Sequence, residues 1–308
     1  MHIYYSGVGK GVIEADERLG TPRYRLFSCH GSYVKYAKAT SPIVAKIDDN
    51  YEIMLDSGAF TAWTKGEEVH LPHLVDVYAE LVDIIGDLNK VWFINLDKIP
   101  GKPGETATEE QLAEAIKISD ENYAVLNEKF PNRVLPVFHQ NEDEARLKEV
   151  CDMSGGYVCI SPRNDLGETY RARWAAETHH LLPEGIRTHG LAATGTQMMT
   201  KVPWLSVDSA TWILIAAYGG IFIDTNFRIV GVSETSPTRH DKNAHVTTLA
   251  DPERDYLYDL MKKWKFTLEE LGTIFESRAL WNRMMMTELY RSIGDTSHLP
   301  VQKGIFDL

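Results

Sequence analysis

Cysteine is scarce in this sequence. Its 308 residues include three cysteines, at positions 29, 151 and 159, and no pair of them has the CxxC spacing of a zinc ribbon. Small disulfide-stabilised domains and zinc ribbons need more cysteines at short spacings, so both classes are excluded. We therefore expect Cys29, Cys151 and Cys159 to be reduced thiols.

A long hydrophobic run is also missing. The most apolar stretch, residues 212–223, contains two glycines. It is shorter than the ~18 residues of a membrane span. The first six residues do not form a basic region followed by an apolar segment, as a secretory signal would. We therefore expect a protein of the cytoplasm that does not enter a membrane.

Positive charge is in deficit. The chain has 32 Lys and Arg against 44 Asp and Glu, a net charge of −12. A protein that binds nucleic acid mainly by neutralising phosphates carries an excess of basic residues, so bulk electrostatic binding is excluded. An enzyme with one local basic patch remains compatible with this composition. The candidates for such a patch are Arg163, Arg171, Arg173, Lys201 and Arg239.

Short apolar runs of strand type are what the sequence does contain. Each ends in a polar residue or a glycine, and they cover residues 24–28, 52–56, 91–97, 134–140, 157–161, 186–190 and 204–208. Amphipathic helical patterns lie between them, at residues 73–88, 108–130, 143–150 and 168–182. This alternation predicts a parallel sheet, and the spacing of the strands predicts an α/β fold of the (β/α)8 TIM-barrel type.

Two further segments follow the predicted strands. Residues 220–224 and 227–232 have the pattern of a β-hairpin, and residues 252–293 have a helical apolar pattern. We therefore predict a TIM-barrel domain over residues 1–250 with a β-hairpin insertion. A C-terminal helical extension over residues 251–308 is predicted to pack on the barrel.

Polar side chains recur at the ends of the predicted strands: Asp56, Asp97, His139, Gln140, Ser161, His189 and Asp208. In a barrel of parallel strands these ends meet at one mouth, where the active site lies. One carboxylate can attack the anomeric carbon of a sugar, and a second can serve as general acid and base. A third can accept hydrogen bonds from the N1–H and amine of a guanine-like base. Composition and spacing leave open which carboxylate takes which role.

The segment Asp56-Ser57-Gly58-Ala59-Phe60 resembles the Asp-Ser-Gly-Gly-Phe motif of the tRNA-guanine transglycosylases. The Thr-Ala-Trp that follows is similar to the branch of phage and bacterial enzymes that place 7-deazaguanine bases in DNA. Later motifs resemble the family in the same order, over roughly residues 50–225: Asn95-Leu-Asp97, Val137-Phe-His139-Gln140, the strand 156–161, His189-Gly190-Leu191 and Ser206-Val-Asp208-Ser209.

The resemblance implies a glycosyltransferase that exchanges guanine in DNA for a 7-deazaguanine base such as 7-cyano-7-deazaguanine. By that resemblance, Asp208 attacks C1′ and Asp56 is the general acid and base. Asp97 and Gln140 read the base edge, and Ser57, Gly58 and Gly190 shape its pocket. The substrate-binding set also includes His139, Ser161 and His189, with Phe60 placed to stack on a flipped base or to pack under the mouth.

The chain departs from the family at one metal site. The tRNA enzymes carry a Cys-x-Cys-x-x-Cys plus His zinc site after the nucleophile, whereas this sequence has no cysteine beyond Cys159. We therefore expect no structural zinc and no other cofactor. The missing zinc cluster and the lack of a basic RNA-binding tail favour DNA over tRNA as the substrate.

Three alternatives stay open on the sequence. The same chemistry on tRNA is one, and a metal-dependent barrel hydrolase that uses His139, His189, Asp208 and Asp97 is another. A non-catalytic barrel that acts as a scaffold is the third. For the leading interpretation the expected partners are DNA and the free base, with a partner protein or a second copy of the chain left open. A phage-encoded enzyme would work in the cytoplasm of its host.

Overall fold

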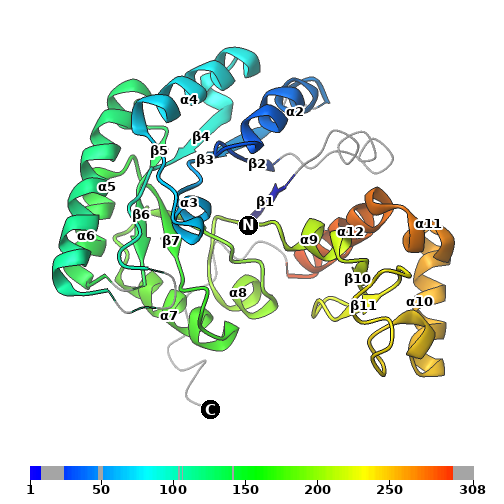
Figure 1. Ribbon diagram of the computed structural model, residues 1–308. Helices are drawn as coiled ribbons and strands as arrows, with labels where there is room; N and C mark the ends of the chain where they lie inside the picture. Colours follow the sequence, from blue (N-terminus) through cyan, green and yellow to red (C-terminus); the bar gives the residue numbers. More distant parts are fainter. Residues whose placement is uncertain (8–23, 48–50, 103–104, 106, 141, 294–308) are drawn as a thin grey trace. The chain divides into compact units, whose positions relative to one another are not determined.

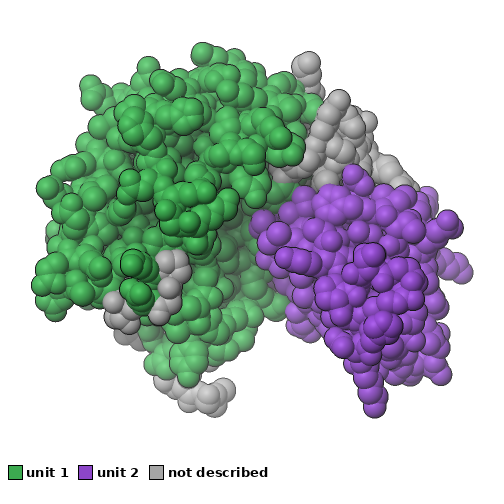
Figure 2. Space-filling model, in the orientation of Figure 1, with its two compact units in different colours: residues 1–8, 21–209, 295–308 green, residues 9–20, 210–294 purple. Residues whose placement is uncertain are grey.

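The structure is a computed structural model that describes residues 1–7, 24–47, 51–102, 105, 107–140 and 142–293. The described chain divides into two units, which Figure 2 colours green and purple. Residues 1–7 and 24–209 belong to the first unit and residues 210–293 to the second.

Short parallel strands form the centre of the first unit (Figure 1). Their order in the sheet is β5-β4-β3-β2-β1-β9-β8-β7-β6, and the pairing of each strand with its neighbour is parallel. The strands are β1 (His2–Ser6), β2 (Tyr24–Ser28), β3 (Glu52–Asp56), β4 (Val91–Ile94), β5 (Val134–Leu135), β6 (Val137–His139), β7 (Tyr157–Ser161), β8 (Arg187–Gly190) and β9 (Ser206–Ser209).

Pro136 joins the two ends of this sheet. It separates β5, which pairs with β4, from β6, which pairs with β7. Proline has no N–H to donate to a neighbouring strand, but its carbonyl accepts a hydrogen bond from the N–H of Cys159 at 2.9 Å. The segment 134–139 therefore serves as one interrupted strand that nearly closes the sheet into a barrel.

Helices follow the strands on the outside of the barrel (Figure 1). A capping box starts the longest of them, because the Thr108 hydroxyl accepts from the N–H of Gln111 while the Gln111 side chain accepts from the N–H of Thr108. The helices of this unit are α2 (Tyr33–Ile47), α3 (Ala59–Lys65), α4 (Leu71–Ile85), the short 3-10 helix η1 (Leu88–Lys90), α5 (Glu109–Lys129), α6 (Glu144–Met153), α7 (Glu168–Leu181) and α8 (Thr196–Lys201).

The predicted TIM-type α/β class is confirmed by this alternation of parallel strands and helices. The structure adds one strand, β1, that the sequence pattern did not predict. Its five residues, His-Ile-Tyr-Tyr-Ser, include one aliphatic side chain, so they give no apolar run of strand type.

Large side chains fill the inside of the barrel. One buried cluster contains eight residues from the seven strands β1 to β7: Tyr4, Leu26, Met54, Ile94, Leu135, Val137, Tyr157 and Cys159. A barrel packed in this way has no open channel, so a ligand can reach only its ends or its outer surface.

The second unit has a core of its own. It contains α9 (Thr211–Ala217), the hairpin β10 (Gly220–Phe222) and β11 (Ile229–Gly231), the 3-10 helix η2 (Val246–Thr248), α10 (Asp251–Trp264), α11 (Leu268–Thr273) and α12 (Phe275–Ile293). The two hairpin strands are antiparallel, as predicted. Trp281 of α12 donates its indole N–H to the carbonyl of Phe222 at 2.6 Å, so the hairpin and this helix share one core.

The boundary between the units differs from the predicted one. The division falls at residues 209 and 210, whereas the sequence pattern places it at 250 and 251. The difference arises because hairpin residues such as Ile221 and Val230 are buried with Leu257 and Trp281 of the C-terminal helices. Packing of residues 251–308 on the barrel stays a prediction, and residues 294–308 lie outside the described part of the chain.

Within the described residues, the helices are all too short or too polar to cross a membrane.

Candidate active site

The carboxyl ends of the barrel strands carry the predicted site residues. Because the strands are parallel, these ends lie at the same end of the barrel. Asp56, His139, Ser161 and Gly190 are the last residues of β3, β6, β7 and β8, Asp208 lies in β9, and Asp97 follows β4. The charges of Asp97 and Asp208 both act on Asp56, which places the three carboxylates in one cluster.

Asp56 is held by the turn that begins α3. The backbone N–H of Gly58 donates a hydrogen bond to the Asp56 carboxylate. Gly58 has a φ of +79°, and a Cβ on it would lie 2.2 Å from the Cβ of His30, so this position requires glycine. Ser57 is fully buried, and its hydroxyl accepts from the N–H of Ala59 at 3.4 Å. Ser57 and Gly58 therefore shape the turn that positions the carboxylate.

The surroundings of Asp56 favour its protonated form. Burial raises its pKa most, the N–H of Gly58 lowers it, and the negative charges of Asp208 and Asp97 raise it further, to about 7. Part of the side chain remains accessible. A carboxyl group with a pKa near neutrality can both give and take a proton at pH 7, which is what a general acid and base must do.

Asp97 is paired with His139. Its Oδ2 lies 2.9 Å from His139 Nε2, and the two side chains are 8% and 14% exposed. Burial alone would lower the pKa of His139, but the hydrogen bond and charge of Asp97 outweigh burial and raise it. The pair therefore favours an imidazolium beside a carboxylate, and it leaves Asp97 Oδ1 without a hydrogen-bond partner among the described residues.

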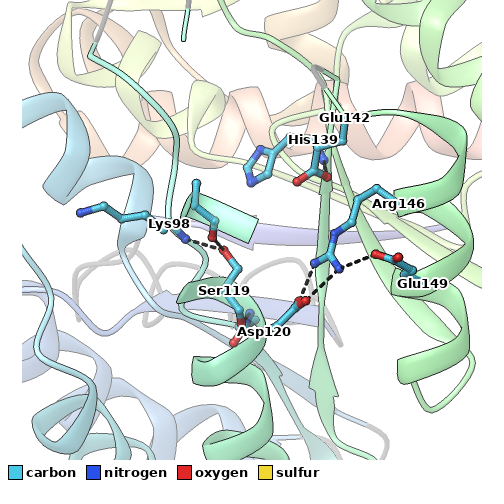
Figure 3. A network of polar contacts seen from close by, with 9 residues as sticks. Lys98, Ser119, Asp120, His139, Glu142, Arg146 and Glu149 are labelled. Atoms are coloured by element: carbon cyan, nitrogen blue, oxygen red, sulfur yellow. Dashed lines mark hydrogen bonds and ion pairs between the residues drawn. The ribbon is translucent and has the colours of Figure 1, made fainter. Parts of the chain in front are cut away.

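Charged side chains gather around the turn and helix that follow His139 (Figure 3). Glu142 accepts a hydrogen bond from the N–H of His139 at 2.8 Å, and burial raises the pKa of Glu142. Arg146, itself buried, donates to both carboxylate oxygens of Asp120 at 3.0 and 2.5 Å and to Glu149 at 3.4 Å. Sequence reasoning missed Glu142 and Arg146, although both lie within seven residues of His139 in the turn and helix that follow it.

Asp208 is fixed through one of its two carboxylate oxygens. Its Oδ1 accepts a hydrogen bond from the N–H of Ala192 at 3.0 Å and lies 3.2 Å from His189 Nε2. No described residue hydrogen-bonds to Oδ2, and the side chain is 13% exposed. A carboxylate with one oriented and one free oxygen is suited to attack an electrophilic carbon.

His189 lies behind Asp208 and is fully buried. Its Nδ1 is 2.6 Å from the hydroxyl of Ser206, which in turn is 2.5 Å from the hydroxyl of Tyr157. Within the described chain His189 contacts Asp208 and Ser206, and its predicted place among the substrate contacts stays a prediction. The period of two along a strand puts Ser206 on the same face as Asp208, a signal that sequence reasoning missed.

Gln140 is oriented by the backbone of a neighbouring loop. Its side-chain oxygen accepts a hydrogen bond from the backbone N–H of Arg163 at 2.9 Å, and the backbone N–H of Gln140 donates to the carbonyl of Ser161 at 3.2 Å. The amide NH₂ of Gln140 has no partner within the described chain. Gln140 can therefore present a hydrogen-bond donor to a ligand.

Phe60 and Gly190 lie in different environments. Phe60, in the first turn of α3, is 49% exposed, and its ring centroid is 5.8 Å from that of Trp63. Gly190 is buried, and a Cβ on it would lie 2.7 Å from the Cβ of Ala193. Phe60 is thus available for stacking, and Gly190 permits close packing at the end of β8.

A pocket of about 270 Å³ opens beside Asp97. Its walls come from α3, the loop that leads to α4, the loop after β4, and α5. They include the apolar side chains of Ala62, Trp63, Leu71 and Ile118 and the acidic side chains of Glu67 and Glu68. A concave space with mixed apolar and acidic walls therefore adjoins the Asp97–His139 pair.

The residues of the hydrolase alternative form two separate pairs, Asp97 with His139 and Asp208 with His189. In the described parts of the chain, no three His, Cys, Asp or Glu side chains are grouped so that they could hold a metal ion. That the protein works without zinc stays a prediction.

Comparisons with profiles of known protein families and with curated protein sequences give no match. The similarity to transglycosylases therefore rests on the motifs alone.

Proposed function

We propose that this protein is a DNA guanine transglycosylase, which exchanges guanine in DNA for a free 7-deazaguanine base through a covalent intermediate. The observation that carries the proposal is the combination of Asp208, with one free carboxylate oxygen, and Asp56, whose pKa is raised to about 7. Base exchange needs a nucleophile and a group that exchanges protons near neutral pH. The choice of base and polymer comes from the motif resemblance.

The two residues account for every bond and proton in the exchange. In the first step, Asp208 Oδ2 forms a bond to C1′ while the C1′–N9 bond breaks, and protonated Asp56 gives its proton to the departing guanine. In the second step, the incoming base loses its N9 proton to Asp56, N9 attacks C1′, and the ester bond to Asp208 breaks. Asp56 is then protonated and Asp208 ionised, as at the start.

Hydrogen-bonding groups suited to a guanine-like base lie at the same end of the barrel as the proposed nucleophile. Asp97 Oδ1 has no hydrogen-bond partner in the described chain and can accept from the N1–H or the amine of the base. The free NH₂ of Gln140 can donate to the carbonyl of the base. Adenine lacks the N1–H and the carbonyl, so this pair of groups favours guanine and 7-deazaguanine.

Exposed aromatic side chains support a nucleic acid as the second substrate. They lie in the first turns of helices that follow barrel strands. Tyr33 and Tyr36 of α2, Phe60 of α3 and Tyr170 of α7 are 49%, 43%, 49% and 71% exposed. Stacking of bases on aromatic rings contributes roughly 1–3 kcal/mol per base and does not require an excess of positive charge.

The test is direct incorporation of a labelled base. The protein is incubated with single-stranded DNA, duplex DNA or tRNA, together with labelled guanine or 7-cyano-7-deazaguanine, and the polymer is digested to nucleosides. We expect label in DNA and a protein–DNA adduct that survives denaturing electrophoresis. In Asp208→Asn the exchange rate should fall at least about 1,000-fold, because loss of a nucleophile removes the covalent route.

Glu177→Gln is the matched control, since it removes an exposed carboxylate on α7 that pairs with Arg173. Its exchange rate should equal that of the wild type. Label in tRNA and not in DNA would contradict DNA as the substrate and favour the same exchange reaction on tRNA. More than about a tenth of the wild-type rate in Asp208→Asn would contradict the role of Asp208.

A further inference from the structure

A chain of buried polar groups runs from the proposed nucleophile into the barrel. It joins Asp208 Oδ1 to His189 Nε2 at 3.2 Å, His189 Nδ1 to Ser206 Oγ at 2.6 Å, and Ser206 Oγ to the Tyr157 hydroxyl at 2.5 Å. His189 and Ser206 are fully buried and Tyr157 is 4% exposed. Water therefore cannot replace a lost hydrogen-bond partner of His189 or Ser206 without entering the core.

The far end of the chain is held by aromatic and cationic contacts. The ring of Tyr157 packs perpendicular to that of Trp92, with centroids 5.1 Å apart, and the guanidinium of Arg187 lies 5.1 Å from the Tyr157 ring centroid. These contacts fix the Tyr157 ring and hold its hydroxyl oxygen at hydrogen-bond distance from Ser206.

The donor and acceptor of each hydrogen bond in this series can be assigned in turn, starting from the Asp208 carboxylate. An ionised carboxylate only accepts, so His189 Nε2 must carry the proton that it shares with Asp208. If His189 is neutral, its Nδ1 is then an acceptor, and the Ser206 hydroxyl must donate to it. The Ser206 oxygen in turn accepts from the Tyr157 hydroxyl.

The opposite assignment leaves one hydrogen without an acceptor. With a proton on both ring nitrogens, His189 Nδ1–H would donate to Ser206 and Ser206 would donate to Tyr157. The Tyr157 hydroxyl hydrogen would then have no acceptor in the described chain, because Ser206 is the one hydrogen-bond partner found for it. A buried donor without an acceptor costs roughly 1–3 kcal/mol, so this arrangement is disfavoured.

We propose that Tyr157, Ser206 and His189 form an ordered relay in which neutral His189 directs its Nε2–H at Asp208 Oδ1. The relay holds that oxygen and leaves Oδ2 as the attacking atom. Tyr157, Ser206 and His189 are thus positioning residues that do not touch the substrate. Their effect on catalysis rests on the proposed function, whereas the proton order does not.

The proton order is tested by ¹⁵N NMR of the full chain with labelled histidine ring nitrogens. We expect His189 to show a protonated Nε2 and an unprotonated Nδ1 at pH 7. Its signals are assigned as those missing from His189→Asn, and they should shift in Ser206→Ala, which removes the donor to Nδ1. In the exchange assay, Ser206→Ala should lower kcat about tenfold and leave the KM for the free base unchanged, since one buried hydrogen bond to a positioning group is lost.

Tyr157→Phe keeps the packed ring and removes the far end of the relay, so it provides a second variant if Ser206→Ala fails to fold. It should shift the His189 signals in the same direction by a smaller amount. Tyr78→Phe is the matched control, because Tyr78 is equally buried but donates to the carbonyls of Leu55 and Ile94. Its His189 signals should match those of the wild type.

Each outcome bears on one proposal. A protonated Nδ1 in the wild type, or His189 signals that are unchanged in both relay variants, would overturn the relay. A wild-type kcat in Ser206→Ala would overturn the positioning role. The expected proton order in a protein that shows no exchange on any polymer would overturn the proposed function and leave the relay order intact.

Discussion

Glu52 and Asp56 are carboxylates at the two ends of one strand, β3, and they differ in almost every physical respect. Both face the inside of the barrel, because they are four residues apart in a strand. Glu52 Oε2 accepts hydrogen bonds from the Tyr4 hydroxyl at 2.9 Å and from the Trp92 indole at 3.3 Å. Asp56 lies instead with two further carboxylates, and its pKa is raised to about 7.

The difference shows that one barrel holds carboxylates in two contrasting environments at its two ends. At the amino end, neutral donors satisfy Glu52, and the guanidinium of Arg133 covers the Trp92 ring at 4.6 Å. At the carboxyl end, like charges are grouped, and one oxygen each of Asp97 and Asp208 has no described partner. Grouped, partly desolvated carboxylates reduce stability, and sites that shift pKa values in this way are typical of catalysis.

The largest effect expected from this contrast concerns the pH dependence of stability. The pKa of Asp56 is raised from 3.8 to about 7 in the folded state. Between these values the folded protein binds more protons than the unfolded chain, so its stability falls as the pH rises. Relative to Asp56→Asn, the wild type should lose roughly 2–4 kcal/mol of unfolding free energy between pH 4 and pH 8.

Urea denaturation of both proteins across this pH range measures the difference. Taking the difference removes the contributions of the other titrating groups, provided that they are the same in both proteins. A constant difference between wild type and variant would mean that the pKa of Asp56 is the same in the folded and unfolded states, and the contrast between the two ends of β3 would be lost.

A smaller effect is expected at the amino end. Glu52→Gln removes the charge that strengthens the hydrogen bonds from Tyr4 and Trp92, and should destabilise the protein by about 1–2 kcal/mol at pH 7. Denaturation monitored by tryptophan fluorescence gives this value. The exchange rate should stay within a factor of about two of the wild type, because Glu52 lies at the opposite end of the barrel. A large loss of activity with unchanged stability would reverse the roles given to the two ends.

The smallest effect is expected from metal removal. Incubation with EDTA or with a stronger zinc chelator should leave the exchange rate and the melting temperature unchanged, because the proposed steps use the protons and oxygens of Asp56 and Asp208. Metal analysis before and after chelation is the control. A stoichiometric metal whose removal inactivates the protein would favour the hydrolase alternative, in which Asp97 and Asp208 are metal ligands.

Local sequence patterns predicted much of the fold. The apolar runs at residues 52–56 and 157–161 match β3 and β7 to the residue, and the capping box at Thr108 starts α5 as expected. These features depend on neighbouring residues, so they can be seen in a linear chain. The position of Asp56 and His139 at strand ends was predictable for the same reason.

The pairing of site residues was not predictable in this way. Asp97 and His139 are 42 residues apart, and Tyr157 and Ser206 are 49 apart. No local pattern specifies such contacts, because they arise when the sheet closes and distant strands come to lie side by side. The division into two units at residues 209 and 210 depends on distant contacts in the same way, because hairpin residues such as Ile221 are buried with residues of the C-terminal helices.

Alternation, capping and turn chemistry act over a few residues, so local sequence is enough to specify which elements form and which side chains stand at the ends of strands. What those side chains contact depends on the tertiary structure. It gave Glu52 two neutral donors, set Asp56 among like charges and placed His189 behind Asp208. The physical reason is that pKa values and hydrogen-bond direction depend on burial and on groups brought together across the barrel, and neither exists before the chain folds.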